Sequence, residues 1–510
     1  MRRKNTGQVA NMGRAMTRTP FARTISSTCR VRKPKAAENL SRSSASAIFE
    51  RDPSLIFLFS GCVLLQFLAN GTPAIEPFLL TIRPMETMPV KSLKVSKMAE
   101  SLIGSEIIKL ASEVKARMAR GEEVYNLTIG DFDPKVFPIP EGLLNEIVAA
   151  YRNGETNYPP ANGVGALREA VSAFLQRRQG LNYDPESILI SGGARPIIYA
   201  IYRTLVDAGD RILYPVPSWN NNHYTHLSQG RGLALETRPE DGFMPTAALL
   251  EPHLKGTSVL ALCSPLNPTG TTFQPEALAE ICDLVLAENA RRGPDEKPLY
   301  MIYDQIYWTL TFGETQHTDP VSLRPEMRDY TLFVDGMSKA FAATGVRVGW
   351  GFGPAPIIAK MRAILSHVGA WAPKAEQVAS AHYLNRTQEV DRDIEMMKSE
   401  VESRLVALYE GFNKMTAAGF PVRAIAPEGA IYLTASFDLR GKTTASGAVL
   451  HTMGDVTQFL LEEAKLAIVP FTAFGSPSDS PWYRLSVGTV RHEQVSKILA
   501  HVENALAQLQ

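Results

Sequence analysis

Four short stretches of the sequence combine residue types that can do covalent and acid–base chemistry. The most distinctive is GMSKAF (336–341), where Lys339 stands among small and apolar residues, with Ser338 before it and Arg347 downstream. Desolvation in such surroundings lowers the pKa of an ammonium group and makes the amine a nucleophile. Most lysines are solvated surface charges, but a surface lysine does not need this setting. Lys339 is therefore the first candidate for a reactive amine.

A carboxylate and an oriented amide are the next candidates. Asp304 follows the apolar run 299–303 and precedes Tyr307; an acid at the end of a buried strand is costly unless it meets a positive partner. Asn267 lies between two prolines in SPLNPTG (264–270), which fix the direction of its amide. Each segment alone also has an ordinary structural interpretation: a salt-bridged acid for Asp304, and for the Asn267 segment a capped Pro/Gly turn, which is the favoured interpretation of that segment in isolation.

The fourth stretch is a candidate anion site. Gly192, Gly193, Ala194 and Arg195 follow an apolar run, and a proline and an apolar helix-like segment come next. Exposed backbone N–H groups at the start of a helix suit a phosphate group. A Gly-Gly pair is more often only a tight turn, so this signal is weak by itself.

The elements that must position these groups are short apolar runs alternating with helix-like segments. Continuous apolar runs are typical of strands covered on both faces, and their alternation with helices indicates a mainly parallel sheet. In such folds ligands bind at the carboxyl ends of the strands, where the four stretches lie. The predicted strands are Ser187–Ser191, Arg211–Tyr214, Ser258–Ser264, Leu299–Tyr303 and Thr331–Val334, and the predicted helices are Ser105–Arg120, Gln274–Ala290 and Glu389–Met415.

Composition excludes several classes of protein. Four cysteines in 510 residues rule out a disulfide scaffold and a Cys-rich zinc module. Residues 1–84 hold 13 Lys+Arg and 4 Asp+Glu, so the remainder has 40 basic and 48 acidic residues. Because the body of the chain is acidic, we expect no nucleic acid among its partners.

Residues 1–84 differ from the rest of the chain and are expected to be a leader outside the enzyme. They contain a 15-residue apolar run, Leu55–Ala69, which is shorter than the ~20 residues of a spanning helix, so we expect no membrane partner. We expect this leader to be disordered or to precede the native start, with synthesis beginning at Met85 or Met88. We expect the protein to be cytoplasmic. The alternative is that the leader is an organellar transit peptide and directs the protein into an organelle.

Taken together, the four stretches supply an amine, an anion cradle, a carboxylate, and an amide with a phenol. These groups are what pyridoxal phosphate requires for its aldehyde, phosphate, ring nitrogen and 3′-oxygen. From about Lys91 to the C-terminus, the chain resembles the class I/II pyridoxal-phosphate-dependent aminotransferases of fold type I, similar to aspartate aminotransferase.

This resemblance implies a role for each candidate residue. Lys339 would carry the cofactor and move the proton, and Asp304 would face the ring nitrogen. The other implied cofactor contacts are Tyr307 and Asn267 at the 3′-oxygen, Ser338, Arg347, Gly193, Ala194 and Arg195 at the phosphate, Trp219 on the ring face, and Tyr158 reaching a neighbouring subunit's phosphate. Arg484 would hold the substrate α-carboxylate, with Gly130, Trp219 and Asn267 also contacting the substrate.

The implied fold is a seven-stranded, mainly parallel α/β sheet in a large domain with a smaller α+β domain. We expect a leader (1–84), an arm and helix of the small domain (85–130), a large cofactor-binding domain (131–375) and a small domain (376–510). The implied assembly is a homodimer with shared active sites.

The implied reaction is transfer of the amino group of an L-amino acid to a 2-oxo acid, with aspartate or glutamate as the expected substrate. In the bacterial aspartate enzymes a lysine of the Gly-Gly loop helps to hold the distal carboxylate; here Ala194 has that position and Arg195 is next, pointing either to the site or to solvent. The alternatives are an aromatic amino acid or prephenate aminotransferase, and a carbon–sulfur lyase. A regulator that binds the cofactor without turnover is disfavoured, because every catalytic position is filled.

Overall fold

The computed structural model describes residues 94–102, 104 and 106–510. The predicted leader with its apolar run, and the possible start residues Met85 and Met88, lie outside the described residues. The described residues belong to one compact unit, Lys91–Gln510. None of the helices in its described part is long and apolar enough to cross a bilayer.

A seven-stranded sheet dominates the described unit and confirms the predicted fold class. Its strand order is β2-β8-β7-β6-β5-β3-β4, and the bonded pairs among β3 to β7 are all parallel, whereas β8 is antiparallel to both of its neighbours. The strands are β2 (Ile188–Ser191), β3 (Arg211–Val216), β4 (Arg231–Glu236), β5 (Thr257–Cys263), β6 (Tyr300–Asp304), β7 (Thr331–Gly336) and β8 (Gly349–Phe352).

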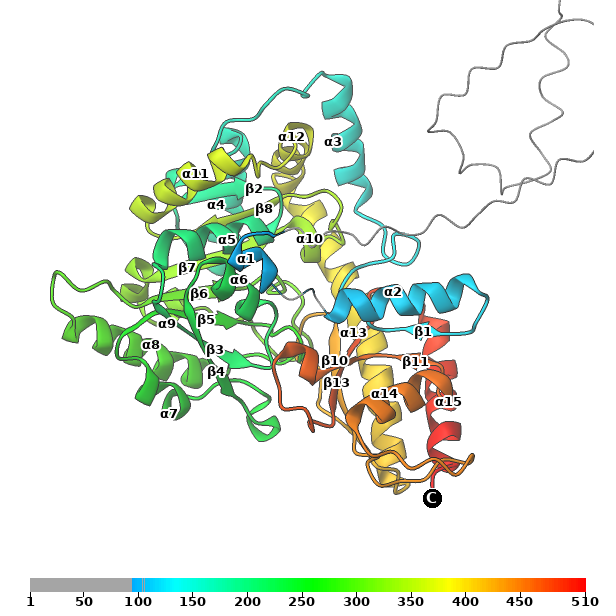
Figure 1. Ribbon diagram of the computed structural model, residues 1–510. Coiled ribbons are helices and arrows are strands. Elements are labelled where there is room, and N and C mark those ends of the chain that lie inside the picture. Colours follow the sequence, from blue (N-terminus) through cyan, green and yellow to red (C-terminus); the bar gives the residue numbers. More distant parts are fainter. Residues whose placement is uncertain (1–93, 103, 105) are drawn as a thin grey trace, which may run out of the picture. The chain divides into compact units, whose positions relative to one another are not determined.

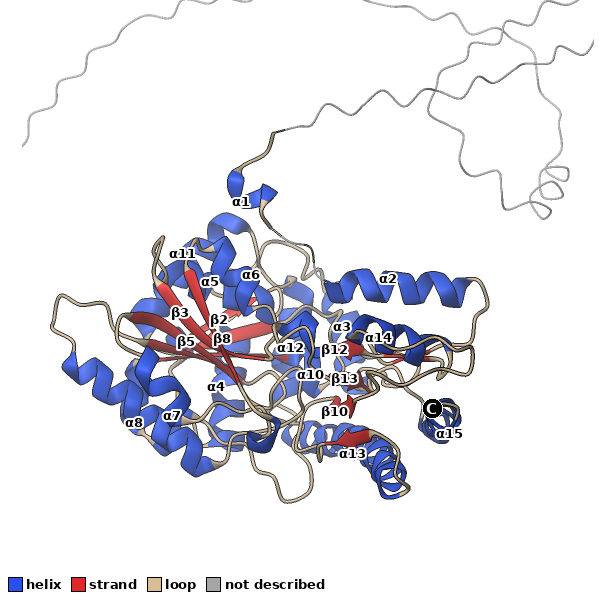
Figure 2. Ribbon diagram, turned by 60° about the horizontal axis from the view of Figure 1, so that its bottom comes forward, coloured by secondary structure: helices blue, strands red, loops and turns tan. Residues whose placement is uncertain are grey.

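Helices cover both faces of this sheet (Figure 1), which explains why most of its strands are continuous apolar runs. Along β5, Val259 and Ala261 enter one core with α5 (Ala194–Leu205) and α11 (Ala355–Val368). Leu260 and Leu262 alternate with them and enter the opposite core. That core also contains residues of α4 (Gly165–Gln179), α8 (Pro275–Arg291) and α12 (Lys374–Leu384). Figure 2 shows the strands as a layer between these helices.

A second core lies around a four-stranded antiparallel sheet of order β12-β13-β10-β9. The short strand β1 pairs with β11, so two segments far apart in the sequence lie side by side here. The elements of this region are α2 (Glu106–Ala119), β1 (Tyr125–Asn126), α13 (Thr387–Ala417), β9 (Val422–Ala424), β10 (Tyr432–Phe437), α14 (Met453–Glu462), β11 (Leu466–Ala467), β12 (Val469–Pro470), β13 (Trp482–Ser486) and α15 (Val495–Ala507).

The remaining helices are short or peripheral to the two sheets. They are α1 (Lys97–Glu100), α3 (Glu141–Arg152), α6 (Asn221–Leu227), α7 (Ala247–Leu250), α9 (Pro320–Leu323) and α10 (Met337–Ala340). Because residues Lys91–Gln510 form one compact unit, the division of this unit at residues 130 and 375 stays a prediction.

The predicted elements agree with the structure to within a few residues. All five predicted strands are present, and the three predicted helices correspond to α2, α8 and α13. The sequence did not indicate β4 and β8. β4 (RGLALE) has a largely exposed burial pattern, and β8 (GWGF) is half glycine, so neither has the apolar run of a central strand.

Candidate active site

The four chemical stretches converge at the carboxyl ends of the strands, around a cavity of about 630 Å³. The loop after β5 brings Asn267, the end of β6 brings Asp304, and α10 after β7 brings Ser338 and Lys339. The other predicted residues that line the cavity are Gly130, Ala194, Arg195, Trp219, Tyr307, Arg347 and Arg484. Gly193, which precedes the lining residue Ala194, and Tyr158 do not line the cavity.

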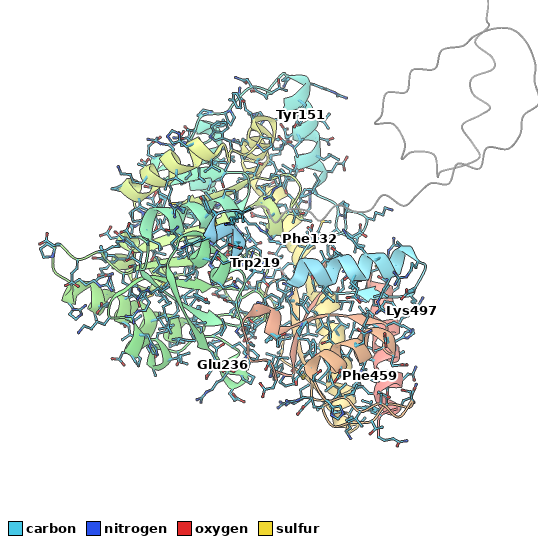
Figure 3. The ribbon with its side chains drawn as sticks, viewed as in Figure 1. Phe132, Tyr151, Trp219, Glu236, Phe459 and Lys497 are labelled. Carbon is cyan, nitrogen blue, oxygen red and sulfur yellow. The ribbon has the colours of Figure 1, made fainter. Side chains whose placement is uncertain are left out.

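The amine of Lys339 is enclosed by protein. Its Nζ donates a hydrogen bond to the carbonyl oxygen of Gly130 (2.6 Å), and it lies 5.5 Å from the ring centroid of Phe132, labelled in Figure 3. Burial, together with the nearby guanidinium groups, lowers the pKa of Lys339 to about 8, although the carboxylate of Asp131 opposes the shift. The amine is therefore far more nucleophilic at neutral pH than an ordinary lysine.

Asp304 presents a carboxylate to the same cavity. Burial raises the pKa of Asp304 to about 6, and the hydrogen bond that its Oδ1 accepts from the Ile306 N–H (3.1 Å) opposes this shift. No ion pair within 4.0 Å neutralises Asp304 among the residues that the structure describes. A cationic donor in the cavity would therefore stabilise this charge, as the sequence predicts for a protonated ring nitrogen.

The anion cradle is built from close backbone contacts. Gly193 caps α5 at φ +98°, and a Cβ there would lie 2.2 Å from the Arg347 Nη2. Arg347 donates to the carbonyl oxygens of Gly192 (2.8 Å) and Thr344 (2.6 Å). The N-terminus of the 12-residue α5, the Arg347 guanidinium and the buried Ser338 therefore surround a site for an anionic group.

Two further glycines pack the cradle against the lysine helix. A Cβ on Gly349 would lie 2.4 Å from the carbonyl carbon of Gly193 and 2.6 Å from the Ala194 nitrogen. A Cβ on Gly336 would lie 2.7 Å from the Gly349 Cα. Backbone therefore touches backbone from the start of α5, across β8, to the residue that precedes α10.

Arg484 is a buried cation with a free donor. It is 2% exposed, and it donates to the Asn267 Oδ1 (3.0 Å) and to the Thr128 carbonyl oxygen (2.7 Å). Its Nε has no hydrogen-bond partner among the residues that the structure describes, and its guanidinium carbon lies 4.6 Å from the ring centroid of Tyr432. A buried donor without a partner costs free energy. Binding of a carboxylate that accepts hydrogen bonds from Arg484 would therefore be favourable.

The structure brings Tyr432 into the site, and the sequence did not indicate it. The hydroxyl oxygen of Tyr432 lies 2.6 Å from that of Tyr307. A Cβ on Gly130 would lie 2.5 Å from the Tyr432 hydroxyl oxygen. Tyr432 sits in β10, whose sequence is an ordinary apolar strand, so no local signal marked it. Asp131, which also lines the cavity, follows directly after the predicted residue Gly130, and this position was the signal that could have indicated it. Ser218, Asn221, Tyr224 and Cys263 also line the cavity.

A second carboxyl group, Asp335, is buried beside the site. It accepts hydrogen bonds from the Trp308 Nε1 (2.8 Å) and the Gly336 N–H (2.7 Å), and it is 1% exposed. Burial raises the pKa of Asp335 to about 8, and the nearby Asp304 adds to the shift. At neutral pH Asp335 is therefore largely protonated, and it anchors the backbone that leads to Lys339.

Tyr158 is 82% exposed and contacts the edge of Trp371, with ring centroids 5.3 Å apart. Its predicted place on a neighbouring subunit's cofactor stays a prediction. Arg195, whose direction the sequence left open, lines the cavity, with its guanidinium carbon 4.5 Å from the centroid of the Trp219 ring.

Comparisons with known proteins show the family to which the chain belongs. The family described as "Aminotransferase class I and II" matches residues 122–502. The aspartate aminotransferase of Geobacillus stearothermophilus is 30% identical over 78% of this chain and 95% of its own length. A probable aspartate/prephenate aminotransferase of Rhizobium leguminosarum is 30% identical over 78% and 95%, respectively. The crystal structure of the Rhizobium meliloti aspartate aminotransferase has a TM-score of 0.75 at 27% identity, covering 82% of this chain and all of that one.

The chain therefore belongs to the class I and II aminotransferases. It is an enzyme that transfers amino groups, and this confirms the predicted reaction class.

Proposed function

We propose that this aminotransferase uses pyridoxal phosphate, carried on Lys339. The observation that carries the proposal is the convergence of a desolvated amine, an anion cradle and an unpaired carboxylate in one cavity. The donor set fits the cofactor, because the approach of Arg347 to Gly193 leaves backbone and guanidinium donors for a phosphate, and Asp304 has no cationic partner within 4.0 Å among the described residues. Ser338, Arg347 and the start of α5 would hold the phosphate.

Pyridoxal phosphate supplies an aldehyde that condenses with amines and a ring that takes up the electron pair left when a proton is removed. Lys339 would remove and return the α-proton at its Nζ, which its lowered pKa favours near neutral pH. Asp304 would keep a proton on the ring nitrogen. Arg484 would orient the substrate through its α-carboxylate, and Tyr307 with Asn267 would contact the 3′-oxygen.

We propose aspartate or glutamate as the amino donor. The names of the relatives support this choice, and the cavity contains an arginine, Arg195, in addition to Arg347 and Arg484. The paired 2-oxo acid would be the acceptor in the reverse half of the cycle.

An aromatic amino acid or prephenate is the second candidate, and a neighbouring cavity favours it. This cavity of about 360 Å³ shares Trp219 with the main one and is also lined by Tyr214, Phe474 and His223. Its described lining contains no Asp, Glu, Lys or Arg, and burial lowers the pKa of His223, which favours the neutral ring. Such a lining suits an uncharged ring.

We also propose a homodimer with shared active sites. Leu144, Val148 and Tyr151 are exposed along one face of α3, and Figure 3 shows Tyr151 on this helix. Exposed apolar faces of this kind are typical of protein interfaces. Tyr158, highly exposed shortly after α3, would then be free to reach a partner's site.

A single-turnover screen tests the reaction and the substrate. The purified holoenzyme is mixed with each amino acid in turn, and the visible absorbance of the cofactor is followed together with formation of the 2-oxo acid. We expect conversion that stops after one turnover until a 2-oxo acid is added. Ammonia or sulfide release without need of an acceptor would instead indicate a lyase.

A further inference from the structure

Two tyrosine hydroxyls from different parts of the fold form a pair in the lining of the cavity. Tyr307 follows β6 of the large sheet, whereas Tyr432 belongs to β10 of the second sheet. Their hydroxyl oxygens lie 2.6 Å apart, and their buried rings meet edge to face with centroids 5.5 Å apart. Within the described part of the chain, neither hydroxyl has another hydrogen bond. Two hydroxyls have two protons and the contact uses one, so the pair keeps one donor for a ligand.

Tyr432 is held in place by two further contacts. The guanidinium carbon of Arg484 lies 4.6 Å from the centroid of its ring, a cation–π contact. Its hydroxyl oxygen packs so closely against Gly130 that a Cβ on this glycine would lie 2.5 Å from it. The carbonyl oxygen of Gly130 in turn accepts the hydrogen bond of Lys339. The Tyr432 hydroxyl therefore contacts both Tyr307 and the segment that binds the reactive amine.

The charges around the pair favour Tyr432 as its donor. Burial raises the pKa of both hydroxyls. At Tyr432, the Arg484 guanidinium is the largest influence that opposes this rise in pKa, and Cys263 and Asp131 counteract it to a smaller extent. At Tyr307, the neighbouring Tyr432 adds to the effect of burial, and the pKa of Tyr307 lies well above its usual value. The Tyr432 hydroxyl is therefore the stronger acid and the better hydrogen-bond donor, which leaves the Tyr307 proton for a ligand.

We propose that Tyr432 is a positioning residue, which donates a hydrogen bond to Tyr307 and thereby directs the Tyr307 hydroxyl toward the 3′-oxygen of the cofactor. The inference rests on the proposed function, in which Tyr307 contacts that oxygen. Each hydrogen bond of such a chain polarises the next one, so the bond from Tyr432 strengthens the bond from Tyr307 to the ligand. Without the Tyr432 hydroxyl, the Tyr307 proton would have no fixed direction.

Four variants test the proposal in the full-length holoenzyme. Y432F and Y307F each remove one hydroxyl and keep the ring, the double variant removes both hydroxyls, and Y483F is the matched control. Tyr483 is a buried residue of β13, which pairs with β10; its hydroxyl lies 3.1 Å from that of Thr457, and it does not line the cavity. Each substitution removes a single oxygen atom from a buried ring, so we expect all four variants to fold, as near-ultraviolet circular dichroism can check.

The first readout is the pH at which the visible absorbance of the bound cofactor changes. This midpoint reports the proton that the 3′-oxygen shares with the nitrogen joining the cofactor to Lys339. A hydrogen bond to the 3′-oxygen stabilises it most when this proton has left, so a weaker bond raises the midpoint. We expect Y432F to raise the midpoint by about 0.3–1 pH unit, the size expected for one hydrogen bond, and Y307F to raise it more. Y483F should leave the midpoint unchanged.

The second readout asks whether Tyr432 acts through Tyr307. In Y307F the receiving hydroxyl is absent, so adding Y432F should cause no further shift of the midpoint. The dissociation constant of pyridoxal phosphate, measured by equilibrium dialysis, provides a check that needs neither turnover nor a titration. This constant should rise about 2- to 10-fold in Y432F and stay unchanged in Y483F.

An unmoved midpoint together with an unchanged dissociation constant in Y432F would overturn the inference, because the Tyr432 hydroxyl would then be only structural. An undiminished shift on adding Y432F to Y307F would overturn it as well, since Tyr432 would act independently of Tyr307. An equal shift in Y483F would indicate a general effect of the second sheet and have the same consequence. These three results leave the proposed function intact. If the wild type binds no pyridoxal phosphate, the proposed cofactor fails and the inference fails with it.

Discussion

The side-chain amine of Lys339 donates a 2.6 Å hydrogen bond to the carbonyl oxygen of Gly130, which lies 209 positions earlier in the chain. Lys339 belongs to the helix after β7, whereas Gly130 belongs to the segment that follows β1. An amine that follows a strand of the large sheet therefore contacts a backbone segment that follows β1, a strand of the second region. The protonation of one amine and the position of the Gly130 segment are physically linked.

The first prediction concerns the pH at which Lys339 becomes reactive. Because burial lowers the pKa of Lys339 to about 8, the neutral amine accumulates above pH 8 and not only near the ordinary value of 10.5. Cofactor-free enzyme mixed with pyridoxal phosphate, reduced with borohydride and mapped by peptide mass should carry the label at Lys339, half-maximally near pH 8. A label confined to another lysine would refute the assignment.

The second prediction is that Lys339→Ala abolishes turnover. Loss of the proton-transferring amine should lower kcat by at least about 10³-fold, since a positioned acid–base group contributes 10²–10⁴ and this one also carries the cofactor. The variant should still bind pyridoxal phosphate through Ser338 and Arg347, as measured by equilibrium dialysis. Lys360→Ala, an exposed lysine on α11, is the control and should keep normal activity. Substantial turnover by Lys339→Ala would contradict the proposal.

The third prediction separates the catalytic and structural roles of Asp304. Asp304→Asn keeps the shape but removes the charge, and a nearby opposite charge shifts a pKa by ~1–3 units. We expect kcat to fall by about 10- to 1000-fold, because each pKa unit corresponds to ~1.4 kcal/mol. Since burial already disfavours the Asp304 charge, the Tm should stay the same or rise. A folded variant with near-normal kcat would make Asp304 a structural acid.

The fourth prediction is a pH dependence of stability from Asp335. Its folded pKa of about 8 lies above the ordinary 3.8, so between these values the folded protein binds a proton that the unfolded chain has lost. The stabilisation is complete at low pH and is lost as the pH rises through about 8. Asp335→Asn removes this linkage, although it loses one hydrogen-bond acceptor.

Urea denaturation at pH 6 and pH 9 measures the Asp335 effect. The free energy of unfolding should be larger for the wild type than for Asp335→Asn at pH 6. This difference in free energy should become smaller or change sign at pH 9. A gap that does not change with pH would show that Asp335 is not protonated in the folded enzyme.

The fifth prediction tests the shared sites of the proposed dimer. Tyr158→Phe and Arg484→Ala homodimers should each have low activity. In a heterodimer one site has Arg484 from one protomer and Tyr158 from the other, so it is intact. Unfolding and refolding the two variants together should restore about a quarter of the wild-type activity, as random pairing of a two-fold dimer requires. Sedimentation as a monomer, or no recovery on mixing, would refute the shared site.

The sequence was sufficient for the groups that stand next to strand ends. Lys339, Asp304 and Asn267 follow apolar runs, and the rule that parallel strands end at one edge brings them together. The same rule could not predict Tyr432, which reaches the site from a strand of the second sheet. Contacts between distant segments depend on how two cores pack, and no local pattern encodes that.

The direction of Arg195 shows the same limit at the scale of one side chain. A rotation of about 100° per residue separates the directions of neighbouring helix positions, so the first turn of α5 could present either Ala194 or Arg195 to the ligand. In the structure both residues line the cavity, and the Arg195 guanidinium contacts the ring of Trp219, which follows another strand. The pattern therefore predicted the helix start and left the side-chain direction open.

The contacts among Gly193, Gly349 and Gly336 have a consequence for how this enzyme can change. Any side chain added at these positions would push the anion cradle away from the lysine helix, so this wall cannot be remodelled one residue at a time. The part of the wall formed by Arg195 and Trp219 is made of side chains, which can be exchanged without moving the backbone. Laboratory evolution toward new amino acids should therefore accumulate its accepted changes on that side and leave the glycine contacts untouched.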